Sequence, residues 1–257
     1  MAQQIRYYYA SNTGKCRRTN QDNFYCNGHW MPAENQGTEG ILSGTADIEK
    51  ITVFGVFDGM GGEERGEMAA AIAAQQMQNA DYAEGMEQAF FQYCVQANRE
   101  ICRYAQENGI GSTGTTAAIM GFHQEKGCLC NIGDSKIFRL SQKKLIQMSC
   151  DHVGIAAFGR KPPLSQNLGI PEEELMIEPY VASGPCEPGD VYLICSDGLT
   201  DMLSQEQIRD ILLQNPGREA ARLLMEGALA QGGKDNITFI LLYVKKRRKK
   251  LLSFWKG

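Results

Sequence analysis

Long apolar runs are missing from this 257-residue chain. It has no stretch of about 18 or more apolar residues, so we expect no membrane-spanning helix. Its first residues lack the apolar core of a secretory signal, and we therefore expect a cytoplasmic protein. With 43% hydrophobic and 22% charged residues, the composition is otherwise that of a globular protein that can bury a sizeable core.

The chain also lacks the paired cysteines and histidines of a zinc site. Nine cysteines is an odd number, which favours reduced thiols in a cytoplasm over a disulfide framework. Cys128 and Cys130 are separated by a single residue and no second pair follows, so the C-x-x-C spacing is absent. We expect both thiols to lie on one face of a strand.

Negative charge dominates the body of the chain and positive charge its end. Lys245 to Gly257 holds seven of the 26 basic residues and none of the 30 acidic ones, which leaves a formal charge of −11 for residues 1–244. An acidic body argues against nucleic acid as the main partner and is compatible with a cation-binding site. The basic tail has two interpretations: it binds an anionic membrane surface at the inner face of the membrane, or it is a disordered, solubilising terminus.

One stretch, Ile51 to Gly62, has the form of a buried strand followed by a glycine-rich turn. Its apolar residues run without polar alternation to Asp58, which is typical of a strand covered on both faces. A carboxylate at the end of such a strand is costly unless a positive group neutralises it. The pattern therefore indicates a site for a hard cation, and the alternative is that Asp58 caps the following turn.

Acids also stand at the boundaries of two other apolar strands. Val191 to Cys195 is a second apolar strand that ends in Ser-Asp-Gly, with the carboxylate at Asp197. Asp235, in the segment Lys234-Asp235-Asn236 that leads into the last predicted strand, Ile237 to Val244, is the third acid at the boundary of a buried strand. Acids at several strand ends can meet at one edge of the sheets, and oxygen ligands without paired His or Cys suit Mg²⁺ or Mn²⁺.

The remaining elements follow from local patterns. Residues 31–49 and 149–172 are rich in Gly and Pro, and we interpret them as an irregular insertion and as a loop or small flap. Ser204 and Gln207 have the spacing of a capping box, and Asn215-Pro216 predicts the start of a further helix. We also expect helices over Glu63–Asn79 and Ala83–Asn108, strands over Ile5–Ala10 and Phe24–Trp30, and a three-stranded meander over Thr115–Phe122, Cys128–Ile132 and Lys136–Leu140.

Seven stretches resemble, in order, the metal-dependent protein serine/threonine phosphatases of the protein phosphatase 2C family in their compact bacterial form. They extend from residue 14 to 238 and read G-K-C-R-R-T-N-Q-D (14–22), V-F-D-G-M-G-G (56–62), G-S-T-G-T-T (111–116), I-G-D-S-K (132–136), L-S-Q-N-L-G (164–169), S-D-G-L-T-D (196–201) and D-N-I-T (235–238). The resemblance implies an α+β fold, a four-layer α/β/β/α sandwich of two mostly antiparallel sheets flanked by helices. It implies one catalytic domain over residues 1–244, followed by the basic tail 245–257.

The resemblance also implies a metal centre of two Mn²⁺ or Mg²⁺ ions. Asp58 would bridge the two ions, the Gly59 carbonyl would bind one of them, and Asp197 and Asp235 would complete the ligands of the other. Asp22 would bind water on the metal close by.

Three further residues have roles by the same resemblance. Arg17 would clamp the substrate phosphate with its planar guanidinium. Asp134, together with Asp197, would form a weaker third cation site. Asn236 would donate or accept hydrogen bonds beside the cluster.

The implied reaction is direct hydrolysis of phosphoserine and phosphothreonine in proteins, opposing a serine/threonine kinase, by a hydroxide that bridges the two ions. We expect a monomer whose partners are phosphorylated proteins, one alternative substrate being a phosphorylated anti-sigma antagonist. An alternative of another class is a catalytically inactive, phosphoprotein-binding member of the same fold, but the retained Asp22, Asp58, Asp197 and Asp235 argue against it.

Three positions depart from the family pattern. Gln21 stands where many members have Glu, which predicts weaker affinity for the second ion. Met60 replaces the His of animal relatives, so the leaving alkoxide must take its proton from metal-bound water or another group. Residues 149–172 are shorter than the usual flap, which predicts a different or looser selection of substrate.

Overall fold

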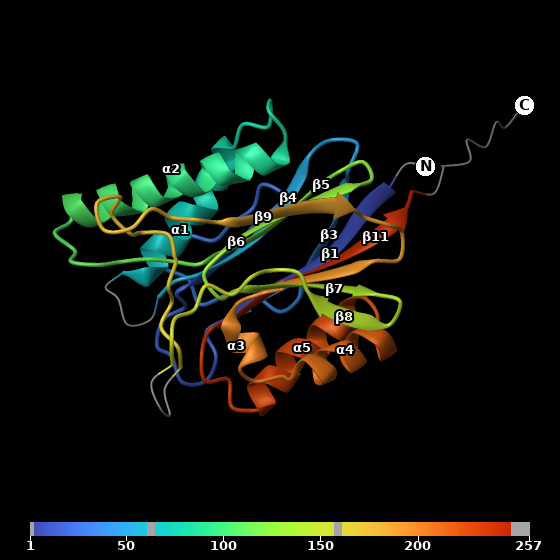
Figure 1. The fold of residues 1–257 in the computed structure, drawn as a ribbon. Coiled ribbons are helices and arrows are strands. Elements are labelled where there is room, and N and C mark those ends of the chain that lie inside the picture. Colours follow the sequence, from blue (N-terminus) through green and yellow to red (C-terminus); the bar gives the residue numbers. More distant parts are fainter. Residues whose placement is uncertain (1–2, 61–64, 157–160, 248–257) are drawn as a thin grey trace, which may run out of the picture.

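The computed structural model describes residues 3–60, 65–156 and 161–247, and these form two packed β-sheets with helices on both outer faces (Figure 1). One sheet has the strand order β3-β1-β11-β10-β7-β8 and the other β2-β4-β5-β6-β9, with all neighbouring strands antiparallel. The strands are β1 (Gln3–Asn12), β2 (Asp22–Cys26), β3 (Leu42–Asp47), β4 (Thr52–Asp58), β5 (Ala117–His123), β6 (Lys126–Ile132), β7 (Lys136–Ser141), β8 (Lys144–Gln147), β9 (Tyr180–Pro185), β10 (Val191–Cys195) and β11 (Ile237–Lys246).

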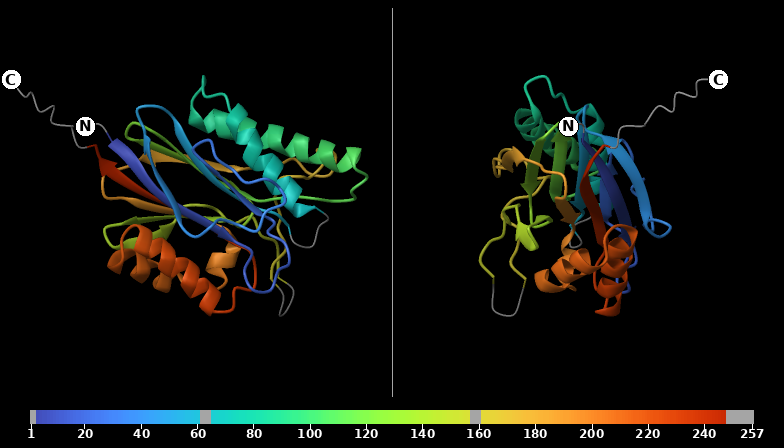
Figure 2. Two further views of the ribbon diagram at one scale, coloured as in Figure 1. Left: turned by 180° about the vertical axis from the view of Figure 1, so that it is seen from behind. Right: turned by 90° about the vertical axis from the view of Figure 1, so that its right-hand side faces the viewer.

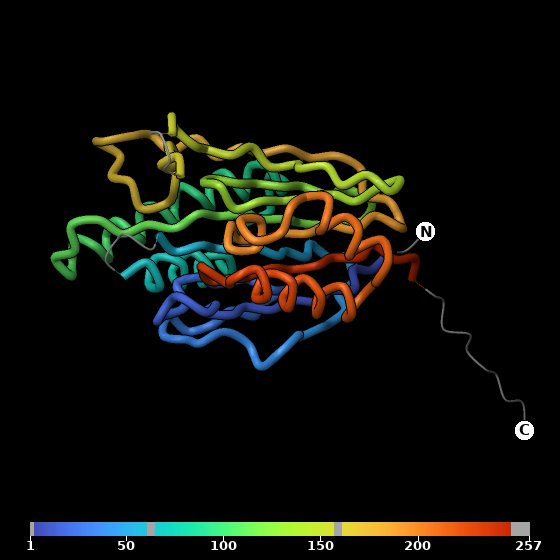
Figure 3. The backbone as a smooth tube through the Cα atoms, turned by 90° about the horizontal axis from the view of Figure 1, so that it is seen from below, coloured from blue at the N-terminus to red at the C-terminus, as the bar shows by residue number. Residues whose placement is uncertain are grey.

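The helices lie outside the sandwich in two groups. α1 (Gly66–Gln76) and α2 (Met86–Glu107) cover the five-stranded sheet, with a short 3₁₀ turn, η1 (Met77–Asn79), between them (Figure 2). On the other side α5 (Arg218–Ala230) contacts β1 and β11, α4 (Gln205–Gln214) contacts β8, and α3 (Asp197–Thr200) packs on β11 (Figure 3). The predicted four-layer α/β/β/α sandwich is confirmed.

Strand β4 shows why its sequence is continuously apolar. Phe54 and Val56 point into the core between the two sheets, while Val53 and Phe57 point to the core under α1 and α2. Both faces of the strand are therefore covered, and alternation with polar residues would bury unpaired polar groups. Asp58, the only carboxylate of this strand, is its last residue, at the end of the part that both cores cover.

The meander predicted over residues 115–140 is wrong in one respect. β5 and β6 pair with each other, but β7 belongs to the other sheet and pairs with β10. Gly133-Asp134-Ser135 is therefore a crossover between sheets, and Gly133 has φ 96°, where a Cβ would press on Thr116. The sequence of a tight turn does not say to which sheet the next strand belongs.

The insertion predicted over residues 31–49 contains a strand. β3 pairs with β1 at the edge of the six-stranded sheet, and of its residues only Ala46 is buried. An edge strand with one buried side chain gives no apolar alternation to detect. β8 and β9, also edge strands, were not predicted.

The helix starts were predicted with mixed success. The capping box is confirmed, since Ser204 Oγ accepts from Gln207 N and Gln207 Oε1 accepts from Ser204 N. The helix start at Asn215-Pro216 is wrong: Asn215 ends α4, and α5 begins after Gly217, which has φ 81°. The predicted start of the first helix at Glu63 lies outside the described residues, and α1 begins at Gly66.

The last strand extends past the first residues of the basic tail. β11 continues to Lys246, and Arg247 Nη1 lies 2.6 Å from Oδ2 of Asp47, the last residue of the edge strand β3. Three residues assigned to the basic tail are thus continuous with the sheet, and the rest of the tail, from residue 248 on, lies outside the described residues. In the part of the chain that the structure describes, no helix is long and apolar enough to span a bilayer. All nine cysteines are free thiols, and Cys128 and Cys130 share the core face of β6 as predicted.

Candidate metal centre

The centre begins with two acids on neighbouring strands of one sheet. Asp22 opens β2 and Asp58 closes β4, and the two are direct partners in the antiparallel register. Directly opposed residues project their side chains to the same face, with Cβ atoms about 5 Å apart. Asp22 is only 2% exposed. Two acids thus share one poorly hydrated face.

The other sheet supplies two more acids at the ends of adjacent strands. Asp197 follows β10 and Asp235 precedes β11, and these two strands pair along their length. Ser196 joins the two sheets here, because its Oγ donates to Asp22 Oδ2 at 2.8 Å and accepts from Thr238 N at 3.0 Å. Acids far apart in the chain therefore meet at one end of the sandwich.

The carboxylates raise one another's pKa values. Burial raises the pKa of Asp22 to about 7, and the charges of Asp197 and Asp235 add to this against the hydrogen bond from Ser196. The pKa of Asp58 lies well above its usual range, first because of burial and then because of the charges of Asp22 and Asp197. The acids therefore lie close enough to act on one another's charge, and ionising them together is costly unless a positive group is near.

The glycine after each of two acids is required by close chain packing. A Cβ on Gly59 would overlap the carbonyl oxygens of Gln21 and Gly66, and one on Gly198 would overlap the carbonyl oxygen of Asn236. Gly59 N donates to the Gln21 carbonyl at 3.1 Å, which holds the turn after β4 against the start of β2. The Asp-Gly pairs in the sequence thus reflect the tight approach of segments around the acids.

Arg17 reaches the same cluster from the loop between β1 and β2. Its Nη2 lies 2.6 Å from Asp235 Oδ2, and its side chain is 41% exposed. The hydrogen bond with Asp235, with the nearby charges of Asp58 and Asp197, raises the pKa of the guanidinium. Arg17 is thus accessible to an anion from solvent while facing the acids.

Asn236 fixes this loop. Its Oδ1 accepts from Gln21 N at 2.8 Å, and its Nδ2 donates to the carbonyls of Thr13 and Thr19 at 2.9 and 3.0 Å. One side chain thus ties both ends of the segment that carries Arg17 to the start of β11. Asn236 therefore holds the Arg17 loop in place, which is a physical basis for the supporting role predicted for it.

Asp134 lies in the crossover between the sheets and is 7% exposed. Burial and the charge of Asp197 raise its pKa, and Lys161 opposes the shift. The Lys161 ammonium contacts both Asp134 and Asp197, and a third carboxylate, Asp201, lies 3.5 Å away. Lys161 was missed from the sequence because residues 149–172 carry no periodicity or motif that singles it out.

The donor set fits Mg²⁺ or Mn²⁺. The ligand candidates are carboxylate and carbonyl oxygens, which are the ligands of hard cations. Among the described residues, no group of three or more His, Cys, Asp or Glu side chains is arranged so that it could hold a metal ion. Instead, Arg17 and Lys161 supply positive charge to Asp235 and Asp197.

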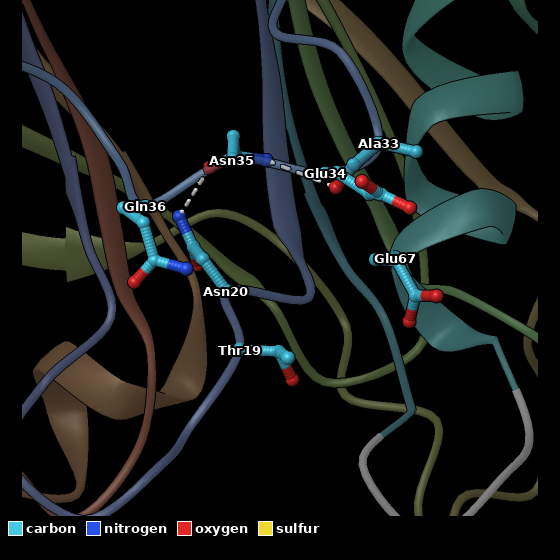
Figure 4. Close-up of a pocket in the computed structure, with 7 residues that line it drawn as sticks. All are labelled: Thr19, Asn20, Ala33, Glu34, Asn35, Gln36 and Glu67. Carbon is cyan, nitrogen blue, oxygen red and sulfur yellow. Dashed lines mark hydrogen bonds between the residues drawn. The ribbon is translucent and has the colours of Figure 1, made fainter.

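A groove of about 390 Å³ lies between the loop that precedes Asp22, the segment of residues 33–36 and the start of α1 (Figure 4). Thr19 and Asn20, just before Asp22 in the chain, line one side, and Glu34 and Glu67 stand on the other. Gln21 Nε2 lies 3.4 Å from Glu67 Oε2, so the amide found in place of a family glutamate contacts a carboxylate from α1.

Comparisons with known proteins identify the family of this chain. A profile of the family described as protein phosphatase 2C matches residues 44–224. The serine/threonine phosphatase Stp of Listeria monocytogenes is 29% identical over 231 residues, covering 81% of this chain and 89% of the relative. The protein phosphatase PhpP of Streptococcus pneumoniae is 28% identical over 212 residues, covering 74% and 85%.

Solved structures are similar over nearly the whole chain. The serine/threonine phosphatase PstP of Mycobacterium tuberculosis superposes with a TM-score of 0.74 and 25% identity, covering 96% of this chain and all of that one. A PstP catalytic domain in complex with two manganese ions has a TM-score of 0.74 and 26% identity, covering 95% of this chain and all of that one. The chain therefore belongs to the protein phosphatase 2C family of metal-dependent protein serine/threonine phosphatases.

Proposed function

We propose that this chain hydrolyses phosphoserine and phosphothreonine in proteins with the acids at the end of the sandwich. The observation that carries the proposal is the convergence of Asp22 and Asp58 from one sheet with Asp197 and Asp235 from the other. The PstP domain that is similar to this chain binds two manganese ions, which supports Mn²⁺ or Mg²⁺ as the cofactor.

Each acid has a proposed place around the ions. Asp58, the Gly59 carbonyl, Asp197 and Asp235 would hold the two divalent cations. When bound, the ions would supply a water of lowered pKa as nucleophile and offset charge on the phosphoryl oxygens. Asp22 would orient water at this site from its buried position opposite Asp58.

Arg17 would bind the phosphate. Its guanidinium is exposed on one side and now contacts Asp235, and a planar guanidinium can donate to two phosphoryl oxygens at once. With Asp235 engaged by a cation, the guanidinium is available to the substrate. Asn236 keeps the Arg17 loop in place for this contact.

This chain lacks a histidine at the position where animal relatives carry one as the proposed proton donor to the leaving group. Met60 occupies that position, and its backbone N donates to the Gly114 carbonyl at 3.1 Å. His152 Nδ1 accepts a hydrogen bond from Gly133 N, so this side chain is used to hold the crossover turn. We therefore assign the donation of a proton to the leaving group to a water molecule at the metal centre.

An inactive phosphoprotein-binding protein is not supported. The relatives are named as phosphatases, and the whole set of expected acids is present in the cluster. Phosphoproteins are therefore substrates of this family member, and which of them it selects is set by surfaces around the cleft, including residues 149–172, which we propose to act as its flap.

Three further proposals concern the whole chain. We propose that residues 1–244 form one catalytic domain that acts as a monomer in the cytoplasm. The basic residues beyond Arg247 would bring it to anionic membrane surfaces. Co-sedimentation with anionic vesicles tests this point, because removal of residues 248–257 should abolish pelleting, and equal pelleting of both forms would contradict it.

The direct test of the activity is Mn²⁺-dependent release of phosphate from a phosphothreonine peptide. Asp58→Asn should abolish it, whereas Asp210→Asn, on an exposed helix face where Asp210 pairs with Arg209, should not change it. Equal activity of Asp58→Asn and the parent chain would overturn the proposed function.

A further inference from the structure

Lys161 is enclosed by three carboxylates from different segments. Its Nζ lies 3.4 Å from Asp134 Oδ2 and 3.5 Å from Asp201 Oδ2, and it contacts Asp197 Oδ2 directly. The Asp134 and Asp197 side chains are 10% and 17% exposed, whereas that of Lys161 is 49% exposed. The ammonium therefore covers two nearly buried carboxylates from the solvent side.

The loop that carries Lys161 is anchored next to one of these acids. His152 N donates to the Gly133 carbonyl at 3.0 Å, and Gly133 N donates to His152 Nδ1 at 3.3 Å. Farther along, Val153 and Leu164 form an antiparallel bridge that draws the two arms of the loop together. The base of the loop is thus fixed to the crossover turn, directly beside the acid that Lys161 contacts.

Other cations near this cluster are engaged elsewhere. Lys136 Nζ lies 2.5 Å from Asp151 and reaches only the backbone carbonyl of Asp134, at 3.3 Å. Arg17 contacts Asp235 on the other side of the centre. Among the described residues, Lys161 is the basic side chain in contact with the Asp134 and Asp197 carboxylates.

An ammonium and a divalent cation cannot share these oxygens. Mg²⁺ binds carboxylate oxygens at about 2.0–2.1 Å, closer than an ammonium approaches, and it needs open positions for its own waters. A cation between Asp134 and Asp197 must therefore first displace Lys161. The Lys161 ammonium therefore occupies the position where an additional cation would bind.

We infer that Lys161 acts as a built-in substitute for a third divalent cation, so that this chain operates with two ions and binds a third only weakly. The inference rests on the proposed two-ion centre. Lys161 is a positioning residue here, because it orients the carboxylate of Asp197, a proposed ligand of the two ions.

The number and affinity of bound Mn²⁺ ions test this inference independently of turnover. Titration with Mn²⁺, followed by calorimetry and by the electron paramagnetic resonance signal of free Mn²⁺, should give two tight ions in the parent chain. Lys161→Met should gain a third ion or tighten it by at least about tenfold. Adding Asp134→Asn to Lys161→Met should remove that ion again.

Two variants act as controls. Lys161→Arg keeps the positive charge and should bind two tight ions, as the parent does. Lys126→Met breaks a remote surface pair, in which Nζ lies 2.5 Å from Glu87, and should leave the count unchanged. Lys161→Gln replaces Lys161→Met if the apolar side chain prevents folding, which circular dichroism reports.

The outcomes separate the inference from the function. A third ion as tight as the first two in the parent chain, or identical titrations of the parent and Lys161→Met, would overturn the role of Lys161 and leave the phosphatase centre standing. Absence of any tight Mn²⁺ in the parent chain would overturn the two-ion centre and the inference together.

Discussion

Asp22 and Asp58 lie directly opposite each other in the register of β2 and β4. Like charges in this position destabilise a sheet, and burial here removes the water that would screen them. The fold keeps the pair in spite of this cost, and Ser196 from the other sheet donates to Asp22 to hold it. Cations bound at the proposed centre would offset the repulsion between the two acids, and the stability of the fold would then depend on its cofactor.

The first prediction concerns Asp58. Asp58→Asn should lower kcat by at least about 10³-fold, because the side chain that bridges the ions loses its charge. The same change should raise the melting temperature of the metal-free protein, since it removes a buried charge opposite Asp22. Calorimetry with excess chelator and a phosphopeptide assay measure the two effects. A metal-free variant that melts below the parent would contradict this account of the pair.

The second prediction concerns pH. Burial raises the pKa of Asp22 to about 7, so between about pH 4 and 7 the folded metal-free protein binds a proton that the unfolded chain has released. The contribution of Asp22 to stability must therefore fall as pH rises through this window. Urea denaturation of the metal-free parent and Asp22→Asn should show the stability difference between them moving in favour of the variant with rising pH. A difference that is independent of pH would refute it.

The third prediction concerns metal addition. Mn²⁺ should stabilise the parent chain by about 2.7 kcal/mol at a concentration 100 times its Kd, because only the folded chain brings the acids together. Asp235→Asn should lose most of this gain, whereas Asp210→Asn should keep it. Thermal melts at several Mn²⁺ concentrations, reversed with chelator, measure the effect. Equal stabilisation of all three proteins would place the ions elsewhere.

The fourth prediction concerns Arg17. Arg17→Ala should lower kcat/KM for a phosphopeptide by about 10–100-fold, the value of charged hydrogen bonds to phosphate, mainly through KM. Arg17→Lys should recover only part of it, because an ammonium cannot reproduce the planar pair of donors. Arg222→Ala, which breaks an exposed pair with Glu219 on α5, is the matched control. An unchanged KM for Arg17→Ala would remove the residue from the phosphate site.

The fifth prediction concerns Gly198. Its Cβ would overlap the Asn236 carbonyl oxygen, so Gly198→Ala should cost about 1–3 kcal/mol of unfolding free energy and lower metal affinity by displacing Asp197. Gly184→Ala, on edge strand β9, has open space around the new methyl group among the described residues and should be neutral. Denaturant melts of the two variants would show the contrast, and equal stabilities would contradict it.

The sequence alone indicated those acids that stand at the ends of buried strands. Asp58, Asp197 and Asp235 stand at the ends of strands whose apolar runs are visible without a structure, because helices and the opposite sheet cover both faces. The resemblance then added Arg17, Asp22 and Asn236, and the structure brings all of them to one end of the sandwich. Their proposed roles at the ions stay predictions.

Other features depend on relations that local sequence does not encode. The crossover at Asp134 has the residues of any tight turn, and β3 exposes most of its side chains at an edge. Lys161 acquires its place only when its loop folds back and is fixed by His152 beside Asp134. Contacts between segments, not periodicity, determine each of these.

The central claim is that acids from both sheets hold a pair of divalent ions. The most direct measurement is an anomalous difference map from crystals of this chain grown with Mn²⁺. The account predicts two strong peaks about 3.5–4 Å apart, both in contact with the Asp58 carboxylate, with Asp197 and Asp235 as further ligands. A map without peaks at Asp58, or with Mn²⁺ bound only elsewhere on the chain, would contradict it.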